Sequence, residues 1–397
     1  MKSYTYLDWA ATTPLSEEAS DAMKPYMIPG RDNIVYGGNA NSLHSPGRAA
    51  FRALEEARGL IARSIHAARP DEIIFTSGAT EADNAVLFGV VSACVKRAKQ
   101  QGKRDFVPHV ITTTFEHDAV LAPLKVMEAR GVEVTRLAPT RQGFIEPQSL
   151  QEALRDNTVL VSIMAVNNEI GTIQPLQELA HLAHEAGALF HSDMVQALGK
   201  MPVDVRALDI DAASFSAHKI CGPKGVGALY MRNKTLFEPF LLGGGQEAGR
   251  RSGTQNVCGA VGFAAACKLA CSDVEAESER LCALRDYLYE QLCALPGVRS
   301  TVAVAPGSRQ HAPHVVNVLV SGFESETLIL RLDFSGYCIS GGSACSSHSL
   351  EPSHVLHAVG ITPDDALGSV RVSMGRYTTR LDVEGFLEAF HKALNWE

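Results

Sequence analysis

Short apolar runs alternate with helical segments over the first two thirds of the chain, and this alternation constrains the fold more than any other feature. The runs include EIIFTS, VLVSIMAV, AASFSA and GVGALYM, and several of them are continuously apolar. Continuously apolar strands belong to sheets that are buried on both faces, with helices packed on either side. The pattern therefore predicts a large α/β domain with a mainly parallel sheet over residues 16–260.

The pattern changes after GGGQEAGRRSGTQN, at residues 243–256. A long helical region follows from about residue 257 to 295, and after it come strands near HVVNVLV, YCIS and RVSMGR with helices between them. This α+β arrangement predicts a smaller second domain, formed by residues 261–397 together with residues 1–15. The glycines at 243–245 are typical of a hinge or of a close approach between two backbones.

Charge and hydropathy exclude several classes of partner. The net charge is −8, and Lys and Arg are scattered along the chain, which argues against binding to nucleic acid or to an anionic membrane. No apolar run approaches the ~18 residues of a membrane span, and the start MKSYTYLDWAATTP lacks the apolar stretch of a signal peptide. The sequence therefore predicts a cytoplasmic protein that acts on a small molecule or on another protein.

The nine cysteines include no CxxC pair and no His/Cys cluster at the spacing of zinc ligands, so we predict a reducing compartment and no metal site. Several cysteines recur with helical apolar periodicity and are predicted to be core residues: Cys94, Cys267, Cys271, Cys282 and Cys293. Cys345 differs, because its surroundings, SGGSACSSHSLEPS, have the composition of an exposed loop. Cys338, beside the apolar Ile339, is the natural control for it.

Polar residues follow the first strand at the point where ligands bind in open α/β sheets. After EIIFTS, the residues Gly78, Ala79 and Thr80 open a helix, whose free N–H groups and threonine hydroxyl could bind a phosphate. The same residues could equally form an ordinary capped loop. Glu81 and Asp83 lie in the first turn, where they suit the helix dipole but would repel a phosphate, so we expect both to turn outward.

Three later strand ends also carry polar side chains, and together they predict one polar pocket: Asn167, Asn168 and Glu169; Asp193 and Gln196; Ser216, His218 and Lys219. A carboxylate can hold a protonated ring nitrogen, serine and histidine can donate to a phosphate, and lysine can link covalently to an aldehyde. These are the requirements of pyridoxal phosphate. Lys224 competes for the role of that lysine, but it lies in the turn GPKG, whereas Lys219 directly ends a strand.

A series of motifs in order from about Tyr6 to Arg376 resembles the cysteine desulfurases, pyridoxal-phosphate enzymes of the class V aminotransferase group. The motifs are YLDWAATTP, TSGATEADN, EHDAV, VNNEIGTIQP, HSDMVQALGK, SFSAHKICGPKGVGALY, GGGQEAGRRSGT, SGGSACSSHSLEPS and RVSMGR. The resemblance implies the fold-type I architecture of pyridoxal-phosphate transferases and the removal of sulfur from L-cysteine. The form SGGSAC resembles the SSGSAC subgroup with the longer loop, which is associated with iron-sulfur cluster assembly and general sulfur supply.

The resemblance also implies a role for individual residues toward the cofactor. Lys219 resembles the lysine that is covalently linked to it, Asp193 the partner of its ring nitrogen, and Gln196 the group near its ring hydroxyl. His117 resembles the imidazole that stacks on the ring and takes part in proton transfer. The phosphate binders of the family correspond to Ala79, Thr80, Ser216, His218 and Thr254, and Thr254 is the one shared across the interface of a homodimer.

On the substrate side, Arg371 resembles the arginine that grips the carboxylate through a bidentate fork. Asn168 is assigned to both the substrate and the cofactor, and Asn39 is a further candidate for the carboxylate. From the residues alone, Arg371 could equally form a salt bridge at a sheet edge. Cys345 resembles the nucleophile that takes sulfur from L-cysteine as a persulfide and passes it to an acceptor protein, which requires a mobile loop.

Four positions depart from the usual motifs of the family: Ala248 in place of an arginine, Gly341 of a serine, Phe115 of a threonine and Ala40 of a proline. None removes a group assigned to the chemistry. Ala248 could alter the edge of the dimer or the entrance of the site, so it bears on the choice of the partner protein. Three other functions stay open: a selenocysteine lyase or a cysteine lyase of the same fold, and a non-catalytic scaffold that relays sulfur through Cys345. An aminotransferase would leave Cys345 without a role.

Overall fold

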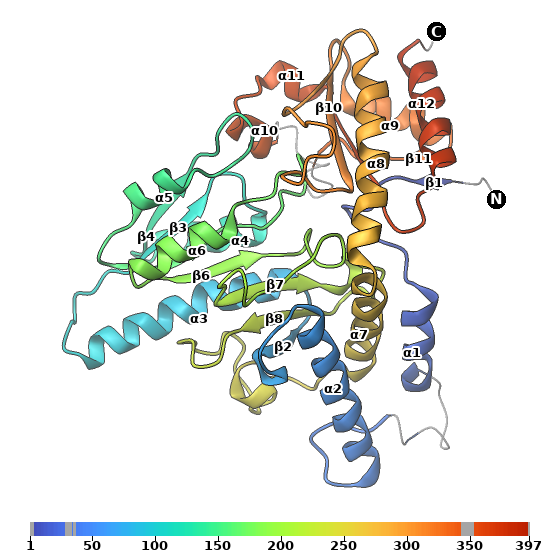
Figure 1. Cartoon of the computed structure of the whole chain (residues 1–397). Coiled ribbons are helices and arrows are strands. Elements are labelled where there is room, and N and C mark those ends of the chain that lie inside the picture. Colours follow the sequence, from blue (N-terminus) through green and yellow to red (C-terminus); the bar gives the residue numbers. More distant parts are fainter. Residues whose placement is uncertain (1–3, 28–33, 35–36, 343–352, 396–397) are drawn as a thin grey trace.

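The computed structural model describes residues 4–27, 34, 37–342 and 353–395 (Figure 1). Its centre is a seven-stranded sheet with strand order β2-β8-β7-β6-β5-β3-β4. Only β8 runs antiparallel to its neighbours, so the sheet is mainly parallel, as predicted. The strands are β2 (Ile73–Thr76), β3 (His109–Thr113), β4 (Glu133–Leu137), β5 (Thr158–Ser162), β6 (Leu189–Asp193), β7 (Ala212–Ser216) and β8 (Gly227–Met231).

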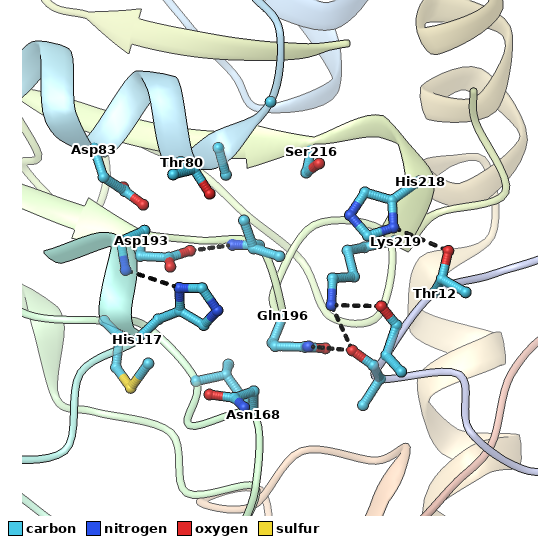
Figure 2. Close-up of a pocket in the computed structure, with 18 of the residues that line it drawn as sticks. Thr12, Thr80, Asp83, His117, Asn168, Asp193, Gln196, Ser216, His218 and Lys219 are labelled. Carbon is cyan, nitrogen blue, oxygen red and sulfur yellow. Dashed lines mark hydrogen bonds between the residues drawn. The ribbon is translucent and has the colours of Figure 1, made fainter. Parts of the chain in front are cut away.

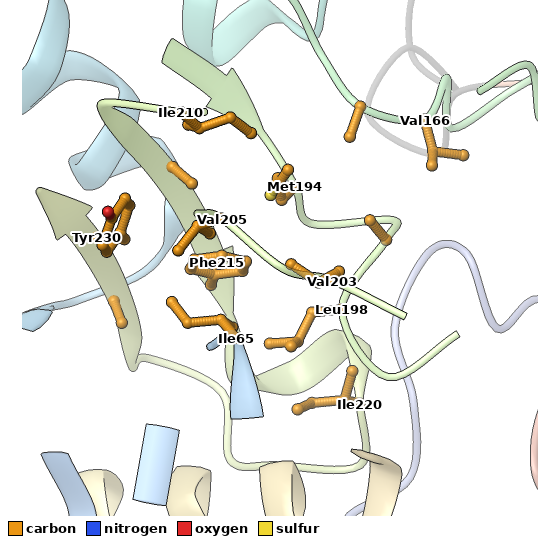
Figure 3. Close-up of a cluster of buried hydrophobic side chains, with 14 of the residues drawn as sticks. Ile65, Val166, Met194, Leu198, Val203, Val205, Ile210, Phe215, Ile220 and Tyr230 are labelled. Atoms are coloured by element: carbon orange, nitrogen blue, oxygen red, sulfur yellow. The ribbon is translucent and has the colours of Figure 1, made fainter. Parts of the chain in front are cut away.

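Successive residues of these strands face opposite apolar layers, because side chains alternate across a strand. In β2, Ile73 and Phe75 belong to one buried cluster and Ile74 to another. The first cluster packs under α2 (Ser45–Ser64), α6 (Leu176–Glu185) and α7 (Val257–Cys271), and the second packs under α3 (Ala79–Gln100) and α4 (Asp118–Glu128). Figure 3 shows part of the first cluster around Phe215 and Tyr230 of β7 and β8. Burial on both faces, predicted from the apolar runs, is confirmed.

The C-terminal third has a core of its own. Its three-stranded antiparallel sheet has the order β12-β10-β9, and its buried cluster includes Val318, Val372 and Phe386. A two-stranded parallel sheet joins β1 (Thr5–Tyr6) to β11 (Tyr337–Cys338). The other elements are α8 (Val274–Cys293), β9 (Val298–Ser300), β10 (Val315–Val320), α9 (Ser325–Phe334), α10 (His354–Ala358), α11 (Pro363–Leu367), β12 (Ser369–Ser373) and α12 (Arg380–Leu394).

The predicted long helical region is two helices, α7 and α8, separated at residues 272–273. Helix α7 packs on α1 (Glu17–Met27) and α2, so it shares the core of the large sheet. The predicted domain boundary near residue 260 stays a prediction. Among the described residues, no single helix has the length and apolar composition of a membrane span, although the bent pair α7 and α8, at 68°, meets both criteria together.

The cysteine predictions hold only in part. Cys267 is buried, and Cys94, Cys271 and Cys282 are half-buried, but Cys293 is exposed. Helix α8 buries a stripe that includes Leu284, Leu288 and Leu292. Cys293 follows Leu292 directly and therefore lies about 100° around the helix from that stripe. The prediction from apolar periodicity that Cys293 is a core residue was therefore wrong.

A buried ion pair joins α2 to the turn that precedes Thr254. Arg58 donates from Nη1 and Nη2 to the two carboxylate oxygens of Glu247, at 2.6 and 3.0 Å. Glu247 Oε2 also accepts from the Phe75 amide of β2, at 3.0 Å. Glu247 belongs to the short 3-10 helix η4 (Glu247–Gly249); the described residues also form η2 (Pro70–Glu72) and η3 (Ala217–Lys219).

The substitution Glu247→Gln is expected to lower the free energy of unfolding by about 3 kcal/mol, because it leaves the Arg58 guanidinium buried without its carboxylate. Denaturant unfolding followed by circular dichroism measures the change. Glu55→Gln is the matched control, since Glu55 also binds Arg58 but its side chain is 40% exposed. Glu55→Gln should lower the free energy of unfolding by less than about 1 kcal/mol. Equal decreases in the two variants would contradict the prediction.

Candidate active site

A cavity of about 460 Å³ opens where the carboxyl ends of several strands of the large sheet meet (Figure 2). The parallel strands β5, β6 and β7 end here together with β2, which lies beyond the antiparallel β8. The cavity is lined by most of the residues that the sequence singled out: Ala79, Thr80, His117, Asn168, Asp193, Gln196, Ser216, His218, Lys219 and Arg371. The predicted polar pocket at the strand ends is therefore present.

Lys219 is held at the end of β7 by the N-terminal segment. Its Nζ donates to the carbonyl oxygens of Ala10 and Ala11, at 2.6 and 3.0 Å. Its own carbonyl oxygen accepts from the buried Lys200, at 3.0 Å. Burial, reinforced by the neighbouring charge of Lys219, lowers the pKa of Lys200 to about 7. Lys224 also lines the cavity, but it is exposed.

The carboxylate at the end of β6 is fixed and buried. Asp193 Oδ1 accepts from the amide of Val195, at 2.9 Å. Burial raises the pKa of Asp193, whereas His117 and Lys219 act in the opposite direction. His117 caps α4, and its Nδ1 accepts from the amide of Ala119, at 3.1 Å. Any proton that His117 exchanges with a ligand therefore passes through Nε2.

Asp83 contradicts the expectation that it turns outward. It is fully buried, it lines the cavity, and His191 Nε2 lies 3.6 Å from its Oδ1. Burial, with the neighbouring Asp193, raises the pKa of Asp83 well above its usual range. Asp83 also lies beyond the first turn, as the fifth residue of α3, whereas Glu81 is the acidic residue of that turn. Packing of α3 on the sheet, rather than the helix dipole, therefore decides which face Asp83 occupies. Glu81 does turn away, to Arg251, with contacts of 2.7 and 3.0 Å.

Glu116 is a third buried carboxyl that the sequence analysis did not assign. Its Oε1 accepts from the amide of Met164 and from the hydroxyl of Thr113, both at 2.9 Å. Burial raises the pKa of Glu116 to about 8. The only signal in the sequence is its place beside His117 at a strand end, because its partner Met164 is far away in the chain.

The start of α3, beside Asp83, can bind an anion. The N-cap of this helix, Gly78, offers no side-chain cap, so N–H groups of the first turn face the cavity region near Thr80. His218 Nδ1 lies 3.0 Å from the hydroxyl of Thr12. Burial, and then the charge of Lys219, lower the pKa of His218 to about 4, so its imidazole is neutral at neutral pH.

Arg371 projects from β12 into the same cavity and is almost fully buried. Its Nη1 donates to the carbonyl oxygen of Asn168, at 3.0 Å, and its Nη2 pairs with Asp8, at 2.9 Å. Within the described part of the chain, its Nε has no hydrogen-bond partner. Arg371 therefore forms a salt bridge, as the alternative interpretation predicted, and its buried Nε remains as a donor for a ligand.

Two predicted site residues lie outside the cavity lining, and a third lies outside the described residues. Cys345 falls in residues 343–352, outside the described part of the chain. Thr254 is exposed and is not part of the cavity lining. Asn39 is also exposed and outside the lining, and its Oδ1 accepts from the amide of Asn41, at 2.9 Å.

Comparison with known proteins places these residues in a family context. A model of the class-V aminotransferase family matches residues 5–386. A cysteine desulfurase IscS of Dictyoglomus turgidum is 44% identical over 99% of this chain and 95% of its own length, and one of Methanosarcina thermophila is 42% identical over 96% and 90%. The solved structure of a NifS-like protein matches with a TM-score of 0.88, at 34% identity and full coverage of both chains. The structure titled SspA in complex with cysteine matches with a TM-score of 0.77, at 32% identity over 96% of this chain and 100% of that one.

The raised pKa of Glu116 predicts how stability depends on pH. The folded chain keeps its proton up to a pH of about 8, whereas the unfolded chain releases it near 4.5. This contribution to stability is therefore complete below pH 4.5 and is lost as the pH rises to 8. At pH 8 the free energy of unfolding of Glu116→Gln, measured with denaturant, should exceed that of the wild type by about a few kcal/mol. At pH 4.5 the difference in the free energy of unfolding should be much smaller. The exposed Glu152→Gln is the control, and an unchanged pH slope in Glu116→Gln would contradict the prediction.

Proposed function

The chain belongs to the class-V aminotransferase family and is a pyridoxal-phosphate-dependent cysteine desulfurase, and from this premise we propose how its residues divide the reaction. The observation that carries the proposal is the meeting of three groups in one cavity: the amine of Lys219, the buried carboxyl of Asp193 and the uncapped start of α3. They come from three different strand ends. Each matches a different part of the cofactor.

The cavity fits pyridoxal phosphate. The first turn of α3, with Ala79 and Thr80, and the side chains of Ser216 and His218 would hold the phosphate. Asp193 would hold the protonated ring nitrogen, whose positive charge would also compensate the buried carboxyls around it. When bound, the cofactor supplies an electron sink for the α carbon of the substrate.

Gln196 and His117 would orient the ring. The Gln196 amide is fixed at both ends, because its Nε2 donates to the carbonyl oxygen of Ala10, at 3.0 Å, and its Oε1 lies 3.1 Å from His314 Nε2. A fixed amide can hold the ring hydroxyl without reorganising. The imidazole of His117 would lie on the face of the ring, with Nε2 as the atom that transfers the proton.

L-cysteine would bind between Asn168 and Arg371. The buried Nε of Arg371 is the donor that a carboxylate would satisfy, while Asp8 keeps the guanidinium in place. Lys219, once displaced by the substrate amine, would take the proton from the α carbon at its Nζ. The carbonyl oxygens of Ala10 and Ala11 keep that amine at the end of β7.

Cys345 would then remove the sulfur. Its thiolate attacks the sulfur of the substrate, an S–S bond forms, and the bond between sulfur and the β carbon breaks. The electron pair of the broken bond takes up a proton on carbon. The products are L-alanine and a persulfide on Cys345, which passes the sulfur to an acceptor protein for iron-sulfur cluster assembly or other sulfur transfer.

We also propose that the enzyme is a homodimer in the cytoplasm, with Thr254 completing the phosphate site of the partner subunit. The surface around Thr254 supports this. Asn41 binds Gln255, at 2.8 Å, and the amide of Ser252 binds the carbonyl oxygen of Leu241, at 3.1 Å. These contacts gather large exposed apolar side chains near Thr254, namely Leu43, Leu241 and Leu242. Exposed apolar groups of this kind mark an interaction surface.

The first prediction of this assignment concerns Cys345. Purified enzyme with L-cysteine and a thiol reductant is expected to release alanine and sulfide in equal amounts. Cys345→Ser should keep the visible absorbance of the cofactor and release no alanine, because only the sulfur acceptor is lost. Cys338→Ser is the control and should stay active. Alanine formation by Cys345→Ser would exclude Cys345 as the nucleophile, and a wild type without cofactor absorbance would favour the sulfur-relay scaffold.

The second prediction identifies the lysine that is linked to the cofactor. Borohydride reduction of the holoenzyme should attach the cofactor irreversibly to the peptide that contains Lys219, as read by mass spectrometry. Lys219→Ala should lose this attachment and more than 99% of the activity, because both the link and the base are removed. Lys224→Ala should keep both. Attachment at Lys224 would reverse the assignment.

A further inference from the structure

Glu169 is a buried carboxyl beside the substrate side of the cavity for which the proposed chemistry has no role. It follows Asn168 in NNEIG, and its exposed fraction is 1%. The turn around it is rigid, because the amides of Glu169 and Ile170 both donate to Asn167 Oδ1, at 2.9 and 3.0 Å. A buried carboxyl is costly unless it binds something specific.

One oxygen of Glu169 binds a residue that is far away in the chain and lies near a second one. Ser353 Oγ donates to Glu169 Oε2, at 2.6 Å. The same oxygen lies 3.2 Å from the point where a Cβ on Gly342 would stand. Gly342 and Ser353 are the described residues on either side of the segment 343–352, to which Cys345 belongs.

The hydroxyl of Ser353 is fully used. It accepts from the amides of Val355 and Leu356, at 3.1 and 3.4 Å, and so caps α10. Its only proton goes to Glu169. The next residue, His354, adds a second anchor, because its Nε2 lies 2.9 Å from the carbonyl oxygen of Glu116. The start of α10 is thereby fixed to the wall of the cavity.

The charge around Glu169 suits a carboxyl that accepts this hydrogen bond. Burial raises the pKa of Glu169, and the Ser353 hydroxyl, Arg371, His354 and His117 all act in the opposite direction. Arg371 reaches the same turn through the carbonyl oxygen of Asn168. Glu169 therefore links Ser353 to the turn whose Asn168 carbonyl oxygen binds Arg371.

We propose that Glu169 is a positioning residue for sulfur transfer, which binds Ser353 and packs beside Gly342, the described residues on either side of the segment that carries Cys345, and so holds them against the substrate side of the cavity. The inference rests on the proposed role of Cys345. It concerns the step in which the Cys345 thiolate meets the substrate sulfur, and it leaves cofactor binding and substrate binding to other residues.

The test separates substrate binding from sulfur transfer in the holoenzyme. Glu169→Ala and Ser353→Ala should keep the visible absorbance of the cofactor and the L-cysteine concentration that half-saturates its spectral change. The rate at which Cys345 acquires its persulfide in a single turnover should fall roughly tenfold, the effect of losing one hydrogen bond to a charged group. The rate of persulfide formation should fall less in Glu169→Gln, because the amide oxygen of the new side chain still accepts from the Ser353 hydroxyl.

Two further variants act as controls. Thr362→Ala removes the cap of α11, a helix of the same length as α10, whose Thr362 accepts from the Asp365 amide at 3.2 Å and does not contact Glu169. Its transfer rate should match the wild type. Gly342→Ala leaves Glu169 in place but adds a methyl group 3.2 Å from its carboxylate, so transfer should slow without a change in cofactor absorbance.

The outcomes distinguish this inference from the proposed function. Wild-type transfer rates in Glu169→Ala and Ser353→Ala would overturn the inference alone. So would equal losses of substrate binding and transfer, because Glu169 would then act on the substrate site. Alanine formation by Cys345→Ser, or a wild type that forms no persulfide, would overturn the proposed function and the inference with it.

Discussion

The hydrogen bonds from Lys219 to the carbonyl oxygens of Ala10 and Ala11 join the two parts of the site. The segment that provides these oxygens also provides Asp8, which pairs with Arg371 from the small antiparallel sheet. The same few residues therefore place the lysine of one sheet opposite the arginine of another. Without this segment the strand ends of the large sheet would still form a polar edge, and the bond from Arg371 to the carbonyl oxygen of Asn168 would remain, but Lys219 and Arg371 would lose the anchors that both take from residues 8–11.

Charge is divided within the cavity. Asp83 and Asp193 line one part of the wall, where burial raises the pKa of both carboxyls. Lys219 and Arg371 line other parts of the wall, and the positive end of α3 lies next to Asp83 on the same helix. A ligand with a cationic ring nitrogen and two anionic groups matches this division. The arrangement can select such a ligand by electrostatics before any covalent chemistry takes place.

Much of the fold could be predicted because the apolar runs are continuous, and continuous runs report burial on both faces. Ligands of open α/β sheets bind at the carboxyl ends of the strands, and this rule predicted that Asn168, Asp193 and Lys219 share one pocket without knowledge of their contacts. The prediction that Asp83 turns outward was wrong, because a helix dipole does not determine which face of a helix meets the sheet. Glu116, Lys200 and Glu169 could not be assigned, since their partners Met164, Lys219 and Ser353 are distant in sequence and only packing brings them near.

The pairing of Thr5 with Tyr337 has a consequence for synthesis on the ribosome. A strand made first must stay unpaired until a partner near the end of the chain emerges, and at about 5–20 residues per second this takes on the order of tens of seconds. The large sheet can assemble earlier, because its last strand ends at Met231. The nascent chain therefore passes through an intermediate in which β1 is unpaired and Arg371 of β12 has yet to reach the cavity, and chaperones have access to that intermediate before the site is complete.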